Sequence, residues 1–349
     1  MERLAKQLGC QWPNIEATKT LALRRREELL SALSTPPPVD SEDRSVVAFG
    51  SIAREEATED SDLDWALLVD GQADPQHLQI TQEIAQRFAD LGLKEPGPTG
   101  VFGHMAFSHE IIHNIGGESD TNRNLTQRIL LLLESVSVSQ KREAYDRVIT
   151  GVLHRYLLED AGLSHAGAQG NLPRFLLNDI ARFWRTMAVD FANKQRERAG
   201  RGWGIRNAKL RFSRKLIFAS GLLVCYRCVL DPPQGPPEDT GSGYANAILD
   251  QLKECVRFTP LDNVADAVLK YGVSSEVAKK LLGCYDQFLG VLRDPGKRKE
   301  LDNLTPNDAA SSVTFQEVRQ NSHEFQDALN VLFFDHEQIG KLTREYGVF

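Results

Sequence analysis

Two aspartates on either side of a single leucine, Asp62 and Asp64, are the residues best placed by type and spacing to do chemistry. In an extended segment side chains alternate, so both carboxylates project from one face while Leu63 projects from the other. Two carboxylates this close repel each other unless they share a cation, and Mg²⁺ is a hard cation that prefers oxygen ligands. The pair therefore predicts a site for one or two Mg²⁺ (or Mn²⁺) ions.

A glycine and a serine, Gly50-Ser51, follow an apolar run at 46–49 and precede Asp62 by ten residues. Glycine lets the backbone approach a ligand closely, and serine offers a hydroxyl and an N–H group to a phosphate oxygen. Phosphoryl-type transfer needs mainly positioning and neutralisation of charge from a protein. Together the two motifs predict a site for a metal-bridged triphosphate, with Gly50 and Ser51 against the phosphates.

These residues also resemble a known family. Residues 49–51 (FGS) and, ten residues later, 62–65 (DLDW) are similar to the motif of the polymerase-β-like nucleotidyltransferases. Within that superfamily, residues 54–56 (REE) followed by 61–64 (SDLD) most resemble the bacterial uridylyltransferases that act on nitrogen-signalling proteins. The resemblance covers about residues 45–150. It implies transfer of a nucleoside monophosphate from an NTP to an acceptor hydroxyl, with a protein as the favoured acceptor and an RNA end, a small molecule or a second nucleotide as alternatives.

A third carboxylate is needed to complete the metal cage of such a site. Glu134 lies in an apolar run that reads as a buried strand at 131–138, where a charge is costly unless it is paired or bound to metal. In the proteins that this chain resembles, a comparable strand carries a further acidic residue. Glu134 is therefore predicted to bind metal together with Asp62 and Asp64, and to help deprotonate or align the acceptor hydroxyl.

Basic residues are concentrated between positions 172 and 216, where twelve Lys and Arg face three Asp and Glu in a chain of net charge −7. This asymmetry indicates a surface for an anion, either phosphates or RNA. Arg206 and Lys209 are predicted to bind the nucleotide, as is Arg54, which would contact a phosphate or brace Asp62. Arg211 and Lys215 are four residues apart and would share a helix face.

A competing motif, His109-Glu110-Ile111-Ile112-His113, matches the HExxH pattern of zinc hydrolases, in which a helix presents both histidines to one metal ion. However, Gly116-Gly117 would end any helix within one turn of His113. We expect a structural pair of histidines, with a zinc hydrolase as one alternative. A non-catalytic nucleotide-binding protein is another.

The elements expected around these motifs define an α+β fold. Short strands are expected at 46–49, 63–69, 105–107 and 131–138, and helices at 14–34, 76–91, 141–159, 173–198, 205–230, 244–257, 262–270, 275–292 and 312–345. This pattern predicts an N-terminal helix and Pro-rich linker (1–40), a small mixed-sheet nucleotidyltransferase domain (41–140) and a larger all-α domain (141–349).

Composition argues against a disordered protein and against a membrane-spanning one. With 41% hydrophobic and 26% charged residues the chain is predicted to be globular, and its apolar runs are far shorter than the roughly 20 residues of a bilayer span. Five cysteines in 349 residues, and no apolar signal core after Met1, predict a cytoplasmic protein. The sequence does not indicate an oligomeric state.

Overall fold

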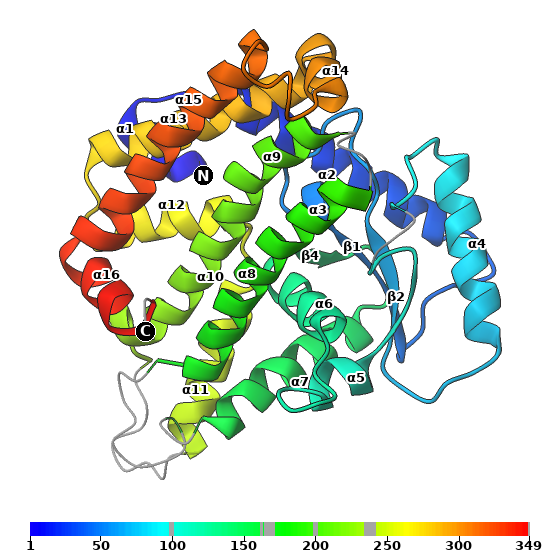
Figure 1. The fold of residues 1–349 in the computed structure, drawn as a ribbon. Helices are drawn as coiled ribbons and strands as arrows, with labels where there is room; N and C mark the ends of the chain where they lie inside the picture. The colour runs from blue at the N-terminus through cyan, green and yellow to red at the C-terminus, as the bar shows by residue number, and fades with distance from the viewer. Residues whose placement is uncertain (98–100, 161–162, 164–171, 198–201, 234–241, 348–349) are drawn as a thin grey trace. The chain divides into compact units, whose positions relative to one another are not determined.

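A computed structural model describes residues 1–97, 101–160, 163, 172–197, 202–233 and 242–347 (Figure 1). They divide into two compact units that interleave along the chain. The sheet unit comprises residues 19–179 and 231–259, and the helical unit comprises residues 1–18, 180–230 and 260–349. The division into an N-terminal segment (1–40), a catalytic domain (41–140) and a helical domain (141–349) stays a prediction.

The sheet unit is built on a four-stranded sheet of order β3-β2-β1-β4. Its strands are β1 (Arg44–Phe49), β2 (Trp65–Val69), β3 (His104–Phe107) and the short β4 (Ser135–Ser137). Strand β1 pairs antiparallel with β2 and with β4, whereas β2 and β3 are parallel. The prediction of a small mixed sheet and a larger helical region is confirmed.

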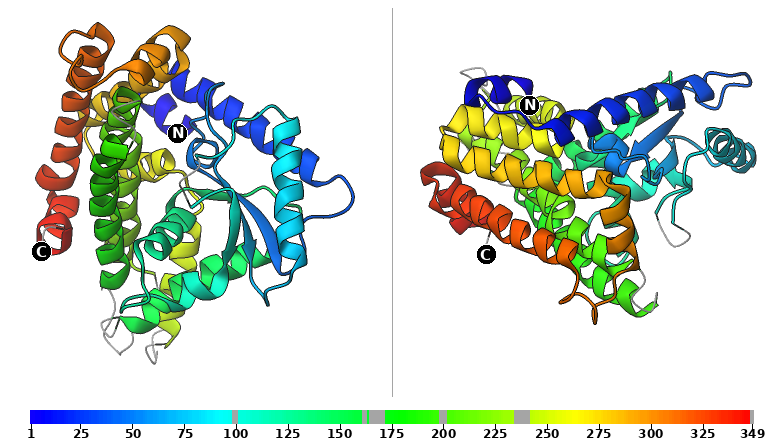
Figure 2. Two further views of the ribbon diagram at one scale, coloured as in Figure 1. Left: turned by 45° about the vertical axis from the view of Figure 1, so that its right-hand side comes forward. Right: turned by 90° about the horizontal axis from the view of Figure 1, so that it is seen from above.

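The alternation of side chains along β1 and β2 gives the sheet two apolar faces. Val46, Ala48, Trp65, Leu67 and Val69 share one core cluster with residues of α2 (Pro13–Leu33) and α4 (Gln76–Asp90), the dark blue and cyan helices of Figure 2. The side chains of the opposite face, such as those of Phe49 and Leu68, line a small apolar cavity together with Ile111 and Leu131. Burial on both faces explains why these strands read as continuous apolar runs.

The strand predicted at 131–138 is wrong over most of its length. Residues Asn122–Leu133 form helix α6, which starts at Thr121, whose side-chain oxygen accepts a hydrogen bond from the N–H of Asn124. Glu134 is the residue that ends this helix, and only the three residues of β4 are extended. A helix buried on most of its surface has a continuous apolar run, which periodicity cannot distinguish from a buried strand.

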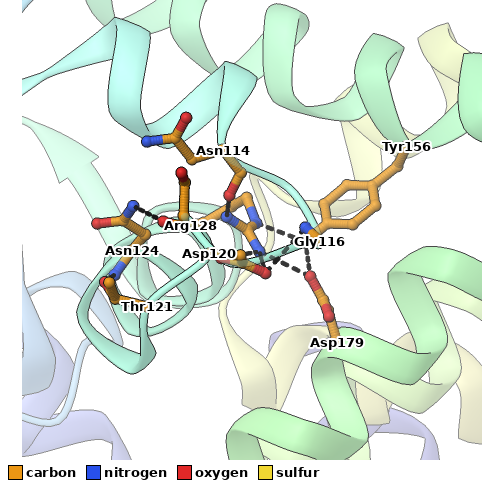
Figure 3. Close-up of polar contacts among 9 residues, drawn as sticks. Asn114, Gly116, Asp120, Thr121, Asn124, Arg128, Tyr156 and Asp179 are labelled. Carbon is orange, nitrogen blue, oxygen red and sulfur yellow. Dashed lines mark hydrogen bonds and ion pairs between the residues drawn. The ribbon is translucent and has the colours of Figure 1, made fainter.

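A buried network of charges ties α6 to its neighbours in the sheet unit (Figure 3). The guanidinium of Arg128, which is fully buried, donates to Asp120 (3.2 Å), to Asp179 (2.8 Å) and to the hydroxyl of Tyr156 (2.7 Å). It also donates to the carbonyl oxygen of Asn114 at 3.2 Å. The network thereby joins α6 to α7 (Glu143–Glu159) and to the start of α8 (Arg174–Glu197). Two further helices of this unit are α5 (Ser108–His113) and α11 (Ser242–Cys255).

The helical unit packs its helices around a cluster of aromatic rings. The rings of Phe212 and Phe288 stack at 4.5 Å between centroids, and Tyr285 and Phe325 complete the cluster. The elements are α1 (Glu2–Leu8), α9 (Trp203–Arg211), α10 (Ser213–Leu230), α12 (Pro260–Tyr271), α13 (Ser275–Arg293), α14 (Pro295–Asn303), α15 (Val313–Asn330), the π-helix η1 (Val331–Asp335), α16 (Glu337–Leu342) and the π-helix η2 (Thr343–Gly347). Phe212 therefore interrupts the helix predicted at 205–230, and π-turns interrupt the one predicted at 312–345. Among the described residues, none of the helices combines the length and the apolar character needed to cross a bilayer.

Candidate functional site

The turn after β1 is shaped by a glycine. Gly50 has φ +66°, in the left-handed region that glycine adopts without steric cost, and it begins the four-residue helix α3 (Gly50–Ala53). A Cβ atom on Gly50 would lie 3.0 Å from Oδ2 of Asp64. The carboxylate of Asp64 therefore lies against the backbone of the Gly-Ser turn, and the two sequence motifs meet in space.

Asp62 and Asp64 lie on the extended approach to β2, which itself begins at Trp65. The N–H of Phe49 donates to the carbonyl oxygen of Asp64 (2.8 Å), and the N–H of Leu63 donates to that of Lys94 (2.9 Å). Leu63 is 2% exposed and belongs to the core, whereas the side chain of Asp62 is 50% exposed. Asp62 and Leu63 thus project to opposite sides, as strand alternation predicts, while the joint metal-binding role of Asp62 and Asp64 stays a prediction.

The charged neighbour of Asp62 is Lys94, whose Nζ lies 3.7 Å from Oδ1 of the aspartate. Both side chains are at least half exposed, so this ion pair is screened by solvent and contributes little to stability. Residue 94 also pairs with residue 62 as an isolated parallel bridge. The bridge keeps the backbone extended where the first carboxylate emerges.

Arg54 and Glu134, both predicted to act at the site, contact each other. The buried guanidinium of Arg54 forms one ion pair with Glu56 (2.9 Å) and another with Glu134. In the sheet register Ser135 pairs with Phe49, so Glu134 lies at the end of β1 on the side away from β2. The role of Glu134 as a third metal ligand stays a prediction.

Within the described residues, no three His, Cys, Asp or Glu side chains are grouped so that they could hold one metal ion. The predicted metal site accordingly rests on the Asp62 and Asp64 pair. The imidazoles of His109 and His113 lie 4.9 Å apart between centroids on the six-residue helix α5, and both are exposed. Glu110 is exposed beside them. The two histidines therefore share a helix face, but within the described residues no third His, Cys, Asp or Glu is placed so that it could hold a metal ion with them.

Arg26, a residue that the sequence motifs do not include, holds the backbone of the Gly-Ser turn. Arg26 on α2 donates to the carbonyl oxygens of Ile52 (3.0 and 2.9 Å) and Ala53 (2.8 Å), the last residues of α3. Its Nη1 also pairs with Glu55 at 3.1 Å, and Glu55 has a positive φ of 61°. Burial lowers the pKa of Arg26, while Glu55 opposes that shift.

The signal for Arg26 was present in the sequence. Ala22, Leu29 and Leu33 on α2 are core residues, and Arg26 falls on the same stripe at spacings of four and three. A charge on an apolar stripe indicates a buried polar partner. The sequence does not show, however, that this partner is the backbone of the Gly-Ser turn, which lies 26 and 27 residues further along the chain.

The two remaining candidates, Arg206 and Lys209, lie on α9 and belong to the helical unit. Both side chains are half-buried. Their predicted contact with a nucleotide stays a prediction.

Comparison with known families decides what kind of domain contains these motifs. Residues 26–98 match the family model of the nucleotidyltransferase domain. The chain carries a nucleotidyltransferase domain. The match begins at Arg26 and includes Gly50, Ser51, Asp62 and Asp64. It supports an enzyme that transfers nucleoside monophosphates, and domains of this type typically use divalent metal ions. No curated protein is similar enough to the chain to count as a match.

Proposed function

We propose that this nucleotidyltransferase is metal-dependent and moves a nucleoside monophosphate from an NTP to a hydroxyl group of a protein, with release of pyrophosphate. The observation that carries the proposal is the contact between the two motifs. A Cβ on residue 50 would lie only 3.0 Å from Oδ2 of Asp64, and this close approach supports a single site made of the Gly-Ser turn and the aspartate pair.

The donor set suits a divalent metal ion. Asp62 and Asp64 supply carboxylate oxygens, which Mg²⁺ and Mn²⁺ prefer, and the exposed side chain of Asp62 can be reached by an incoming ion. A metal ion held by the two aspartates would neutralise charge on the triphosphate. The Lys94 ammonium, 3.7 Å from Asp62, is a weakly held cation that an ion can replace.

The protein's own groups position the reactants. Ser51 is half-buried and offers its hydroxyl and N–H to a phosphate oxygen, while Arg26 fixes the backbone of the turn. The acceptor oxygen forms a bond to the α-phosphorus as the bond between that phosphorus and the bridging oxygen to the β-phosphate breaks. The hydroxyl proton leaves to water, which reaches the site beside the half-exposed Asp62. The Arg54–Glu134 pair, buried between α3 and β4, acts in this proposal by holding the turn against the sheet.

The resemblance of residues 54–64 to the uridylyltransferases of signalling proteins favours a protein as the acceptor. The acceptor is therefore tested together with the reaction. The full chain is incubated with a cell lysate, Mg²⁺ or Mn²⁺, and each of the four NTPs, labelled in turn at the α- and the γ-phosphate. Label from the α-phosphate alone should enter protein, because a kinase would transfer the γ-phosphate instead.

Two variants complete this experiment. The Asp62→Asn/Asp64→Asn double variant should lose transfer, while Asp90→Asn, which removes an exposed carboxylate at the end of α4 in the same unit, should keep it. Label in RNA or in small molecules would correct the acceptor but keep the reaction. Transfer that survives the double substitution would contradict the proposal, and binding of NTP without any transfer would favour a non-catalytic nucleotide-binding protein.

A further inference from the structure

The helical unit contains a cluster of cations that carboxylates do not neutralise. Arg211 ends α9, Lys215 lies in the first turn of α10, and Arg319 lies on α15, which packs against α9. In the part of the chain that the structure describes, none of the three is ion-paired with an aspartate or a glutamate. Arg211 and Lys215, expected on one helix face, lie instead on the successive helices α9 and α10, and α15 adds the third cation.

Neutral side chains orient these cations. Arg211 donates through Nε to Oδ1 of Asn207 (2.6 Å) and through Nη1 to the hydroxyl of Ser322 (3.2 Å). Lys215 donates to Oε1 of Gln326 (2.5 Å). The Ser322 hydroxyl in turn donates to the carbonyl oxygen of Arg319 (2.7 Å), which ties the cluster to the backbone of α15. These acceptors fix the directions of the Arg211 and Lys215 side chains and leave their charge uncompensated.

The cluster is unfavourable without a ligand. Burial and the nearby Arg211 lower the pKa of Lys215 to about 8, and burial and Arg319 lower the pKa of Arg211. Lys215 also lies at the N-terminal end of α10, where the helix dipole disfavours a cation, and the first turn of α10 has no acidic residue to offset it. An anion that touched all three side chains would relieve each of these costs.

We propose that Arg211, Lys215 and Arg319 bind a phosphate group of a small anion. Arginine can present two parallel N–H groups to phosphate oxygens, and lysine adds a compact point charge. Arg211 and Lys215 are half-buried beside the buried Ser322, whereas Arg319 is exposed and can be reached from solvent. Three cations of which two are half-buried suit one phosphate group better than a polynucleotide, whose backbone is tracked by a row of exposed cations. Inorganic phosphate, pyrophosphate and the phosphates of a nucleotide share this chemistry.

The proposal is tested through the reactivity of Lys215 in the full chain, without divalent cations. The chain is treated with a limiting amount of acetic anhydride near pH 8, at constant ionic strength, and the modification of each lysine is measured by mass spectrometry. Saturating pyrophosphate should slow acetylation of Lys215 about fivefold or more, because a bound anion that raises its pKa by one unit lowers the neutral fraction of the amine at pH 8 from about a half to about a tenth. Lys299, exposed on α14 of the same unit, is the internal control and should not change.

Parallel arms with inorganic phosphate and with ATP identify which source of phosphate is preferred. Arg319→Gln changes an exposed residue and should remove the protection, whereas Lys299→Gln, which removes the same charge, should keep it. Equal acetylation of Lys215 with and without all three anions would overturn the proposal. So would protection that persists in Arg319→Gln, or protection by an RNA oligonucleotide alone. Because the experiment needs neither metal nor turnover, its outcome is independent of the proposed transferase reaction.

Discussion

Replacing Gly50 by alanine tests the contact on which the site depends. Alanine at φ +66° costs about 1–2 kcal/mol of unfolding free energy, because its Cβ crowds the backbone in the left-handed region. The new Cβ would also lie 3.0 Å from Oδ2 of Asp64, so the carboxylate must move by a few tenths of an ångström or more. A catalytic group displaced by about 1 Å costs roughly a hundredfold in rate, so we expect transfer to fall about ten- to a hundredfold in Gly50→Ala.

Gly92 provides the matched control. It has a similar φ of +68°, but a Cβ there would meet nothing within 4 Å. Gly92→Ala should therefore lose a similar 1–2 kcal/mol of unfolding free energy in urea titrations and keep its activity. The assay measures incorporation of label from α-labelled NTP at temperatures where both variants are folded. Equal activity of the two variants would refute the argument that the Asp64 carboxylate must lie against Gly50.

Three further predictions concern residues around the site and in the helical unit. Arg26→Ala should reduce the rate of transfer about tenfold and the unfolding free energy by about 1–3 kcal/mol, because the carbonyl oxygens of α3 lose their donors. Arg24→Ala, on the exposed side of α2, is the control. Equal rates of transfer for the two variants would contradict the role of Arg26. Arg128→Met should lower the unfolding free energy, measured in urea, by about 3–5 kcal/mol, because Asp120 and Asp179 stay buried without their cation. The exposed control Arg142→Met should lower it by less than about 1 kcal/mol. Similar losses for the two variants would argue against a buried network. Finally, the pKa of Lys215 is lowered by burial from 10.5 to about 8, so the unfolded chain binds more protons between those values and the unfolding free energy should rise with pH across that window. Lys215→Met should flatten the rise, and an unchanged slope in urea midpoints would contradict this assignment.

Local pattern was sufficient to predict three of the strands, β1, β2 and β3, and the burial of Leu63 between two acids. Leu63 is apolar between two acids, and strand alternation leaves it no place except the core. The apolar run that ends at Gly50-Ser51 likewise predicted β1 and its turn, and β1 ends at Phe49. These features depend on side chains one or two residues apart, which a single sequence displays directly.

Features that depend on tertiary contacts were not predictable in the same way. The helix at 122–133 was assigned in part to a strand because burial removes the polar face that would reveal its period. The pairing of Arg26 with the carbonyls of Ile52 and Ala53 joins residues separated by 26 and 27 positions, and that of Arg54 with Glu134 joins residues 80 apart. A sequence shows that such a charge needs a partner, but not which partner the fold supplies.

The central claim is that Asp62 and Asp64 hold a divalent metal ion beside the phosphates of an NTP bound at Gly50-Ser51. The most direct test is a crystal structure of the full chain with Mn²⁺ and an NTP analogue that resists cleavage at the α-phosphate, in which anomalous scattering locates the metal. The account predicts a manganese peak bridging oxygens of both aspartates and the triphosphate, roughly 2.0–2.2 Å from each ligand. A bound nucleotide whose phosphates lie elsewhere, with both carboxylates facing solvent and no metal between them, would contradict it.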